Sequence, residues 1–252
     1  MAKYDNSSAG DWAFETRSIH AGGGLDGDTG SRNQPIHMTT SYVFDSAENA
    51  ANRFNLSESG YIYTRLNNPT VAALEERLAS LEGGVAALAF ASGQAAETAV
   101  ILNLAGAGDH IVTSPRLYGG TETLFQVTLK RLGIEFTFVE NPDDPESWQA
   151  AVRPNTRAFF GETFGNPIAD VLDIPAVAEV AHRNGVPLIV DNTVATAALA
   201  RPLELGADLV VNSLTKFYTG NGSSIGGVIV DGGKFDWTVE RDGQPVHEQF
   251  VT

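Results

Sequence analysis

The chain has 252 residues, enough for one large domain or two small ones, and its 42% hydrophobic and 19% charged content argues against global disorder. A net charge of −15 argues against non-specific binding to nucleic acid and against binding to an anionic membrane surface. Without cysteine, the chain has no disulfide, no thiolate nucleophile and no cysteine-ligated metal.

The N-terminus lacks the apolar stretch of a signal peptide, and no apolar run reaches membrane-spanning length. A cytoplasmic protein is therefore expected. Residues 1–10 are predicted to be disordered, and residues 12–40 are rich in glycine and turn residues without a sustained period. A short helix is expected over residues 46–55. These features predict an extended arm that packs on another surface, often a second subunit.

The arm ends in a pattern suited to binding an anion. Tyr63 and Arg65 are two residues apart in a segment predicted to be extended, so both side chains would point to one face. A phenol and a guanidinium at one place could clamp a phosphate or a carboxylate. An edge strand with an ordinary exposed arginine is the alternative. A turn is expected at residues 67–69, and Thr70 is expected to cap the next helix.

Helices and strands alternate beyond the arm. Helices are expected over residues 71–81, 95–103, 121–131, 144–152 and 174–184, and strands over residues 85–90, 110–113, 134–139, 157–161, 186–190, 209–212 and 224–230. Seven strands with intervening helices predict an α/β fold with a mostly parallel sheet covered on both faces. Ligands bind such sheets at the carboxyl ends of the strands. The following residues fall there: Ser92, Tyr118, Asn166, Asp191 and Lys216.

Lys216 is the first candidate for chemistry. It follows the buried strand over residues 209–212, where rigid backbone would hold it away from solvent. Desolvation lowers the pKa of a lysine, and a neutral amine can attack a carbonyl to form a Schiff base. Ser213 and Thr215 add two hydroxyl groups that suit phosphate oxygens. A surface lysine in a loop is the alternative.

A second candidate is an anion site at the start of a helix. Ser92, Gly93 and Gln94 connect the strand over residues 85–90 to the helix over residues 95–103. Free backbone N–H groups and the helix dipole make such a turn favourable for a phosphate. The signal is weak by itself, because many turns of this kind bind nothing.

Two further strand ends carry polar or aromatic side chains. Asp191 closes a strand 25 residues before Lys216, and a buried carboxylate there needs a cationic partner. A pyridinium N–H would serve, and Tyr118 could stack on the same ring. A turn cap for Asp191 and core packing for Tyr118 are the alternatives.

Other cofactor and metal sites are disfavoured. The one glycine-rich candidate for a dinucleotide site, at residues 106–110, precedes a strand instead of following one. The histidines show no pair at i, i+3 or i, i+4 that would suit a metal, so each is expected to be a surface histidine or a hydrogen-bonded structural one. They are His20, His37, His110, His182 and His247.

Five motifs together resemble one family in order and spacing. They are ASGQAAE, YGGTETLF, GETFGNP, VDNTVATA and SLTKFYTG, the last followed by GGVIVDGG. This set is similar to the cysteine/methionine-metabolism family of pyridoxal-phosphate (PLP) enzymes, over about residues 16–237. The motif YTRLNNPT is most similar to the O-acetylhomoserine sulfhydrylases, because the sibling lyases and synthases more often carry glycine at the position of Asn68. The resemblance implies the aspartate-aminotransferase-like fold, PLP fold type I.

The resemblance also implies roles around the ring of the cofactor. Lys216 would hold the cofactor covalently and move protons, and Asp191 would pair with the pyridine nitrogen. Tyr118 would stack on the ring and assist proton transfer. Asn166 would lie near the 3-oxygen of the ring, and Thr193 near the ring itself.

The phosphate of the cofactor would bind to backbone N–H groups and hydroxyls. The groups implied are the N–H groups of Gly93 and Gln94 in the turn after Ser92, and the hydroxyls of Ser213 and Thr215. Gln94 stands where many relatives have methionine, which matters little if its role is through the backbone. Tyr63 and Arg65 would reach the phosphate of a neighbouring subunit, in a homotetramer built from tight dimers.

The implied reaction is a γ-replacement, in which O-acetylhomoserine and sulfide or methanethiol give homocysteine or methionine and acetate. A cystathionine γ-synthase or methionine γ-lyase is the alternative enzyme, and a cofactor-free scaffold is the alternative outside enzymes. The implied domains are an arm over residues 1–70 and a PLP-binding large domain over residues 71–252. A smaller C-terminal domain with a carboxylate-binding arginine is expected to be missing, and the run over residues 241–252 is expected to be a loop. We therefore expect these 252 residues alone to bind the cofactor weakly and to turn over poorly.

Overall fold

The computed structural model describes residues 11–24, 26–27 and 29–250. The disorder predicted for residues 1–10 lies outside that part of the chain. By their internal contacts, residues 1–80 and 81–252 form two compact units, and each is described by itself. Within the described residues, no helix has both the length and the apolarity needed to cross a membrane.

The first unit contains helices α1 (Phe14–His20), α2 (Ala47–Phe54) and most of α3 (Pro69–Glu82). Helix α1 lies in the segment predicted to be wholly extended, which is a correction. It has no buried residue, and α3 holds it instead: Arg77 Nε donates to the carbonyl of Ala21 at 2.7 Å. At Gly22 a Cβ would lie 2.0 Å from a carbonyl oxygen of α3, so only glycine permits this approach. Because α1 is only seven residues long and buries no apolar face, its sequence shows no helical period of apolar residues.

Two local predictions around residue 65 are also corrected. Tyr63 forms an isolated bridge with Ser41, but Arg65 lies in the turn that follows and not in an extended segment. Helix α3 is capped by Asn68 and not by Thr70, because Asn68 Oδ1 accepts the Thr70 N–H at 2.9 Å. The amide of Asn68 also donates to the carbonyl of His37 at 3.0 Å.

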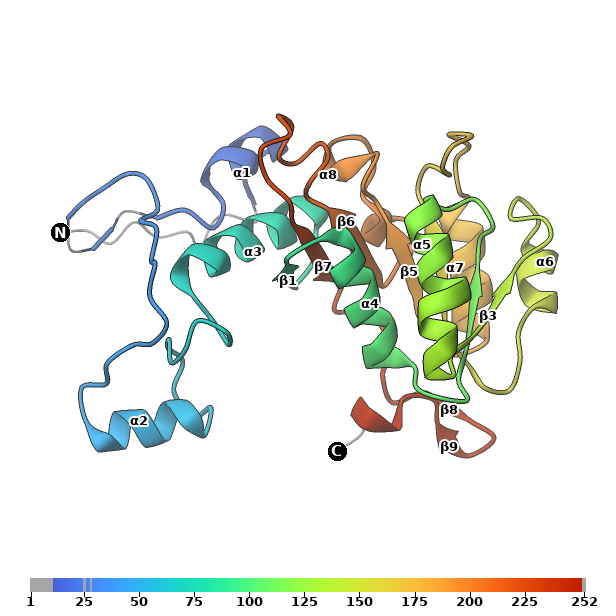
Figure 1. Cartoon of the computed structure of the whole chain (residues 1–252), viewed down its shortest axis with the longest axis horizontal. Coiled ribbons are helices and arrows are strands. Elements are labelled where there is room, and N and C mark those ends of the chain that lie inside the picture. Colours follow the sequence, from blue (N-terminus) through green and yellow to red (C-terminus); the bar gives the residue numbers. More distant parts are fainter. Residues whose placement is uncertain (1–10, 25, 28, 251–252) are drawn as a thin grey trace. The chain divides into compact units, whose positions relative to one another are not determined.

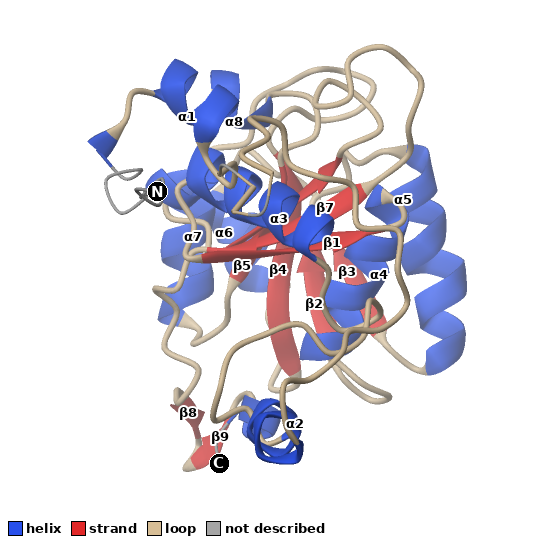
Figure 2. Cartoon of the chain, turned by 90° about the vertical axis from the view of Figure 1, so that its left-hand side faces the viewer, coloured by secondary structure: helices blue, strands red, loops and turns tan. Residues whose placement is uncertain are grey.

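The second unit is built on a seven-stranded sheet (Figures 1 and 2). Its strands are β1 (Ala86–Phe90), β2 (His110–Thr113), β3 (Glu135–Phe138), β4 (Thr156–Glu162), β5 (Leu188–Asp191), β6 (Leu209–Ser213) and β7 (Gly227–Asp231). The order is β1-β7-β6-β5-β4-β2-β3. Strand β7 is antiparallel to both neighbours and every other pair is parallel, which confirms the mostly parallel sheet.

The helices of this unit cover both faces of the sheet (Figure 1). They are α4 (Gly93–Leu104), α5 (Gly119–Thr123), α6 (Pro145–Ala150), α7 (Ile174–Arg183) and the short α8 (Thr196–Leu199), with a 3₁₀ turn at Pro202–Glu204. The helix predicted over residues 121–131 is α5 continued by a π-helical turn (Leu124–Leu129) and a 3₁₀ turn (Lys130–Leu132).

Two apolar cores lie on opposite sides of the sheet. Phe160 of β4 belongs to the core under α4 and α5, whereas its neighbour Phe159 belongs to the core under α6 and α7. Successive residues of a strand point to opposite faces, so a strand buried on both sides reads as a continuous apolar run. This is why the strand positions could be predicted well.

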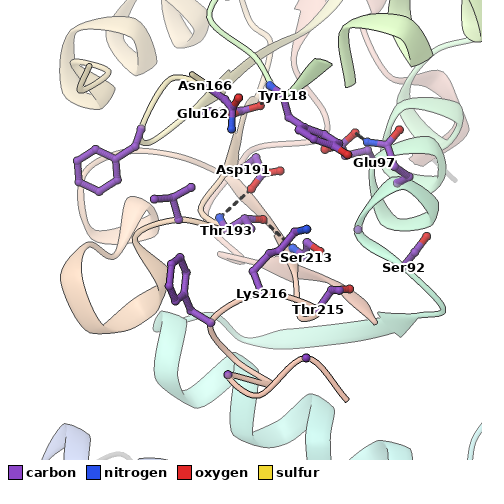
Figure 3. A pocket seen from close by; sticks show the side chains of 17 residues that line it. Ser92, Glu97, Tyr118, Glu162, Asn166, Asp191, Thr193, Ser213, Thr215 and Lys216 are labelled. Carbon is purple, nitrogen blue, oxygen red and sulfur yellow. Dashed lines mark hydrogen bonds between the residues drawn. The ribbon is translucent and has the colours of Figure 1, made fainter. Parts of the chain in front are cut away.

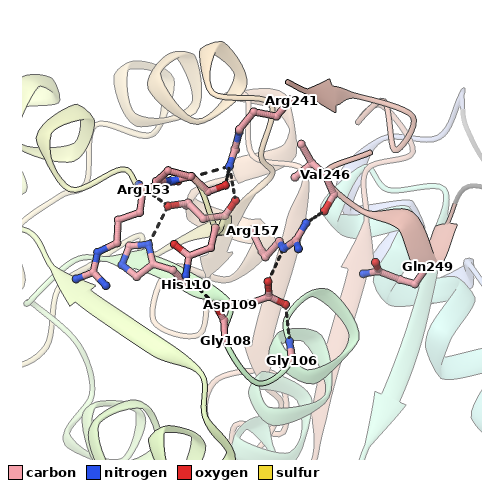
Figure 4. A network of polar contacts seen from close by, with 12 residues as sticks. Gly106, Gly108, Asp109, His110, Arg153, Arg157, Arg241, Val246 and Gln249 are labelled. Atoms are coloured by element: carbon pink, nitrogen blue, oxygen red, sulfur yellow. Dashed lines mark hydrogen bonds and ion pairs between the residues drawn. The ribbon is translucent and has the colours of Figure 1, made fainter. Parts of the chain in front are cut away.

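The last described residues form structure instead of the predicted loop, which is a further correction. Strands β8 (Glu240–Arg241) and β9 (Gln244–Pro245) make a small hairpin, and a 3₁₀ turn follows at Glu248–Phe250. Figure 4 shows how two arginines hold this segment at the amino ends of the strands. The Arg241 guanidinium donates to the carbonyls of Pro154 and Asn184, each at 2.6 Å. Arg157 Nε lies 2.7 Å from Asp109, and its Nη1 donates to the carbonyl of Val246.

Candidate active site

A cavity of about 560 Å³ lies at the carboxyl ends of the parallel strands (Figure 3). Apart from Tyr63 and Arg65, every site residue predicted from the sequence lines it: Ser92, Gly93, Gln94, Tyr118, Asn166, Asp191, Thr193, Ser213, Thr215 and Lys216. Tyr63 and Arg65 belong to the first unit, where the Arg65 guanidinium lies 5.7 Å from the centroid of the Tyr63 ring. The sheet thus gathers residues separated by more than a hundred positions.

The start of helix α4 forms one wall of the cavity. Ser92 is its N-cap, and its hydroxyl accepts the Ala95 N–H at 3.1 Å. The N–H groups of Gly93 and Gln94 precede the first intrahelical bond and are available to an anion. A Cβ at Gly93 would lie 2.7 Å from Cβ of Ser213, so glycine lets the helix approach the end of β6.

Two hydroxyl groups near this wall form hydrogen bonds with the protein backbone. The Thr215 hydroxyl faces Gly226, donating to its carbonyl at 3.3 Å and accepting its N–H at 3.2 Å. Thr193 Oγ1 accepts the Ser213 N–H at 2.7 Å, which fixes the end of β6 against the segment after β5. These contacts tie the wall to the ends of the neighbouring strands.

Asp191 is buried at the end of β5. Its carboxylate accepts the N–H of Thr193 at 2.7 Å, and no salt bridge reaches it within the described parts of the chain. Burial raises the pKa of Asp191, while the Thr193 hydrogen bonds and a contact with Glu97 lower it. A buried carboxylate aimed into a cavity without a cation of its own fits a cationic or N–H-bearing ligand.

Two more carboxyl groups line the cavity, and the sequence reasoning missed both. Glu162 ends β4 and accepts the backbone N–H of Tyr118, and burial, followed by the charge of Asp191, raises its pKa to about 8. Burial and the charge of Asp191 raise the pKa of Glu97 to about 9. Both stand inside motifs that were read for other residues, GETFGNP and ASGQAAE. An acidic residue on a buried strand end or helix face was the available signal.

The side chain of Gln94 also makes contacts that the sequence did not reveal. Its amide donates to Glu97 Oε2 at 2.6 Å and to the hydroxyl of Thr121 at 3.2 Å. Thr121 in turn donates to the Glu97 carboxyl at 2.9 Å. Gln94 therefore links the turn at the start of α4 to a buried acid.

Lys216 lies in the turn after β6, and its side chain points into the cavity (Figure 3). It is the one cationic side chain among the residues that line the cavity. A buried network fixes the segment behind it: Tyr218 donates to Glu82 at 2.9 Å, and Asn212 Nδ2 donates to the same oxygen at 2.9 Å. Asn192, next to Asp191, also bonds Glu82. One buried carboxyl group thus anchors the segments that carry both Lys216 and Asp191.

Tyr118 and Asn166 close the opposite side of the cavity (Figure 3). Tyr118 is 49% exposed, so it is not the core residue of the alternative interpretation. Its backbone is fixed by Glu162, which leaves the phenol ring over the cavity. An aromatic face above, an acid at the back and an amine below enclose a space that suits a flat heteroaromatic ring.

The histidine predictions hold for four of the five residues. His20 and His37 are exposed. His110 is buried between the hydroxyls of Thr156 and Thr137 at 2.8 and 2.9 Å, and His182 pairs with Asp208. His247 differs: it is fully buried, and neither ring nitrogen has an aligned hydrogen-bond partner within the described residues. It packs against the aromatic rings of Trp237 and Phe250, which a single sequence does not reveal.

Comparison with known proteins agrees with the site. The sequence profile of the Cys/Met metabolism PLP-dependent enzymes matches residues 15–244. The O-acetyl-L-homoserine sulfhydrylase of Corynebacterium glutamicum is 75% identical over 252 residues, which is 100% of this chain and 58% of that protein. The homocysteine synthase of Schizosaccharomyces pombe is 51% identical over 225 residues, 89% of this chain and 52% of that protein. The chain thus spans about half the length of the curated relatives it matches.

Solved structures give the same fold. A putative O-acetylhomoserine (thiol)-lyase from Campylobacter jejuni, solved with N′-pyridoxyl-lysine-5′-monophosphate, superposes with a TM-score of 0.85 at 39% identity. The match covers 89% of this chain and 55% of that one. The metB protein of Corynebacterium glutamicum gives a TM-score of 0.81 at 38% identity, over 87% of this chain and 55% of that one. The predicted fold type I is confirmed, and the chain belongs to the Cys/Met metabolism family of PLP-dependent enzymes.

Proposed function

We propose that this chain carries the PLP site of a transferase that converts O-acetylhomoserine and sulfide, or methanethiol, into homocysteine, or methionine, and acetate. The carrying observation is the placement of Lys216, Asp191 and Tyr118 around one cavity. The 75% identical sulfhydrylase supports the choice of substrates. When bound, the cofactor supplies an electron sink for carbanions next to the substrate amine.

The residues present fit that cofactor. Asp191 is a buried acid without a salt bridge in the described residues, and it would hold the proton of the ring nitrogen. The N–H groups of Gly93 and Gln94 and the hydroxyls of Ser213 and Thr215 would bind the phosphate. Asn166 and Thr193 would contact the ring and its 3-oxygen.

Lys216 would hold the cofactor covalently in the resting protein. Once the substrate amine takes that place, the freed Lys216 amine would accept protons from Cα and then Cβ of the substrate. Tyr118 would orient the ring by stacking and assist these transfers. Acetate would leave from Cγ, and the sulfur of sulfide or methanethiol would form its new bond at the same carbon. Lys216 would then return the protons to Cβ and Cα.

The attachment site is the direct test. PLP is added to the full-length protein, the complex is reduced with borohydride, and the labelled peptide is identified by mass spectrometry. We expect a visible absorbance band and a label on Lys216, both absent in Lys216→Ala. Lys234→Ala, which changes an exposed lysine, is the matched control and should keep both. A folded protein that stays colourless with excess PLP would contradict the proposal and favour the alternative of a cofactor-free scaffold protein.

Product analysis separates the sulfhydrylase from its siblings. With O-acetylhomoserine as first substrate, we expect homocysteine from sulfide and little cystathionine from cysteine. Cystathionine as the main product would identify a cystathionine γ-synthase. Release of methanethiol from methionine would identify a methionine γ-lyase.

The arm belongs to the same proposal. We infer that Tyr63 and Arg65, whose side chains lie together and are exposed, bind the phosphate in a neighbouring subunit of a homo-oligomer. Mixed oligomers test this: Arg65→Ala and Lys216→Ala subunits are each expected to be nearly inactive. Unfolding and refolding them together should restore activity, since a hybrid pair has one complete site. Failure of every hybrid to regain activity would place Arg65 and Lys216 in the site of the same subunit.

A further inference from the structure

Glu82 is a buried acid that the proposed mechanism does not use. It is the last residue of helix α3, it is fully buried, and it is not among the residues that line the cavity. Burial of a carboxyl group costs free energy, and the helix dipole opposes a negative charge at the C-terminal end of a helix. Neither the helix nor the apolar core therefore explains an acid at this position.

The turn that carries Lys216 is bonded to Glu82 on both sides. Asn212, four residues before the lysine, donates its side-chain amide to Glu82 Oε1 at 2.9 Å. Tyr218, two residues after the lysine, donates its hydroxyl to the same oxygen at 2.9 Å. The Tyr218 hydroxyl also accepts the N–H of Ala197 at 3.2 Å. The backbone around the lysine is thus held from both directions by one carboxyl group.

The segment that carries Asp191 reaches the same carboxyl group. Asn192 follows the aspartate at the end of β5 and is fully buried. Its Nδ2 lies 3.3 Å from Glu82 Oε2 and donates to the carbonyl of Ala200 at 2.9 Å. Its Oδ1 accepts the hydroxyl of Thr163 at 2.8 Å. Glu82 therefore connects the end of β5 with the turn after β6.

A rigid ring makes strict demands on these two segments. Lys216 and Asp191 line one cavity (Figure 3), and in the proposed site both would engage the same flat cofactor. Their spacing must then match one ring, because small errors of position slow a reaction strongly. Lysine is a long and flexible side chain, and ordering it together with its turn costs conformational entropy. A turn that is already fixed loses less entropy when the cofactor binds.

We propose that Glu82 is a positioning residue of the PLP site: it holds the turn of Lys216 at a fixed place relative to Asp191, so that both can engage one cofactor ring. It acts through hydrogen bonds from each of the two segments. The inference rests on the proposed function. It accounts for an acid whose place is unfavourable for the helix that carries it.

Hydrogen exchange of the full-length protein without cofactor tests the first step. Tyr218→Phe removes one hydroxyl and keeps the ring, whereas Glu82→Gln turns one acceptor oxygen into a donor, so that one of its partners is left unpaired. We expect the amides of residues 213–220 to exchange about tenfold faster in both variants, since each loses a buried hydrogen bond. Exchange as in the wild type in both variants would overturn the proposal.

The matched control is Asp208→Asn. Asp208 is also a buried acid, and it accepts the N–H of Leu188 at 2.8 Å at the amino end of the sheet. The change from acid to amide is the same as in Glu82→Gln, but the exchange of residues 213–220 should stay as in the wild type. Faster exchange of residues 213–220 in the control as well would show a general loss of stability and would contradict a specific role of Glu82.

Attachment of PLP to Lys216 tests the consequence. PLP is added at saturating concentration, samples are reduced with borohydride at timed intervals, and the label on the lysine is measured by mass spectrometry. We expect the initial rate to fall about tenfold in Glu82→Gln and Tyr218→Phe and to stay unchanged in Asp208→Asn. Thermal unfolding is measured on the same proteins, because a merely structural role would lower the melting temperature without changing this rate. Equal rates in all four proteins would overturn the proposal.

Two kinds of failure remain distinguishable. If Glu82→Gln does not fold, Tyr218→Phe decides alone, because it removes a single hydroxyl from the same carboxyl group. If the wild type gains no label at any concentration of PLP, the proposed function fails, while the exchange result still decides whether Glu82 holds the turn.

Discussion

The buried polar groups at the two ends of the central sheet are paired to different degrees. At the amino end, Arg157 and Arg241 face carbonyls and an acid, so that charge and hydrogen bonds are matched (Figure 4). At the carboxyl end, one cavity is lined by three acids, Glu97, Glu162 and Asp191, and by a single lysine, Lys216. The first arrangement stabilises the fold by itself, whereas the second leaves charge for a ligand to complete.

The two ends are also expected to respond oppositely to pH. The acids of the cavity have raised pKa values, about 9 for Glu97 and about 8 for Glu162. Near the amino end, burial lowers the pKa of His110 and His247 to about 4. Above about pH 5, the acids at the carboxyl end therefore hold more protons in the folded protein than in the unfolded chain. Below about pH 6, the histidines at the amino end hold fewer protons in the folded protein than in the unfolded chain. Variants at each end can separate the two effects.

The largest effect is expected at Asp191. Asp191→Asn removes the charge that would face the ring nitrogen, so binding of PLP should weaken at least roughly a hundredfold, as for the loss of a buried charged partner. Folding without the cofactor should not suffer, because a buried charge is removed as well. Fluorescence titration and thermal unfolding measure the two quantities.

Asp109→Asn makes the same change at the other end of the sheet. Asp109 contacts Arg157 at 2.7 Å, so the variant should lose stability while binding of PLP remains unchanged. Equal loss of binding in both variants would show that the two ends are not independent.

The next largest effect is the loss of stability that Glu162 causes as pH rises. Between pH 4.5 and about 8, folded Glu162 keeps a proton that the unfolded chain has lost, so the free energy of unfolding falls as pH rises through this window. Glu162→Gln should remove part of that fall, on the order of 2 kcal/mol, since each group contributes about 1.4 kcal/mol per pH unit. Urea unfolding at pH 5 and pH 8 measures it. A variant with the slope of the wild type would show that Glu162 is already ionised at pH 5.

At neutral pH, the amino end gives an effect of about the same size. Arg241→Ala removes the donors that bond the carbonyls of Pro154 and Asn184, and the loss should cost about 2 kcal/mol of unfolding free energy. The exposed Arg131 supplies the control, because Arg131→Ala should cost less than about 0.5 kcal/mol. Urea unfolding of both variants is the measurement, and an Arg241→Ala protein as stable as the control would show that the hairpin adds nothing.

The sequence predicted the sheet and most of the residues that line the cavity. It did not predict the buried acids Glu97 and Glu162, which line the same cavity. Strands such as β4 are apolar on both faces and are bounded by polar residues, which is a local signal. Asp191 ends β5 and Lys216 lies in the turn just after β6, so the topology of the sheet brings them to the same edge. Glu97 lies in a helix, and its neighbour Asp191 is 94 positions away, so their contact depends on how α4 packs. The hairpin over residues 240–245 was missed because its stability comes from Arg241 and distant carbonyls, not from an apolar pattern.

The smallest effect is expected for His247. Burial, and after it the charges of Arg157 and Arg241, lower its pKa to about 4, whereas the unfolded chain binds a proton near pH 6.5. The unfolded state thus holds more protons between these values, and stability falls as pH decreases from 6.5 to 4. His247→Leu keeps an apolar side chain among Trp237 and Phe250 and should recover about 1 kcal/mol at pH 5 relative to pH 7. His37→Leu changes an exposed histidine and should leave the acid response as it is. If both variants keep the acid response, it comes from other groups, and His110 is the next one to test, because burial lowers its pKa to about 4 as well.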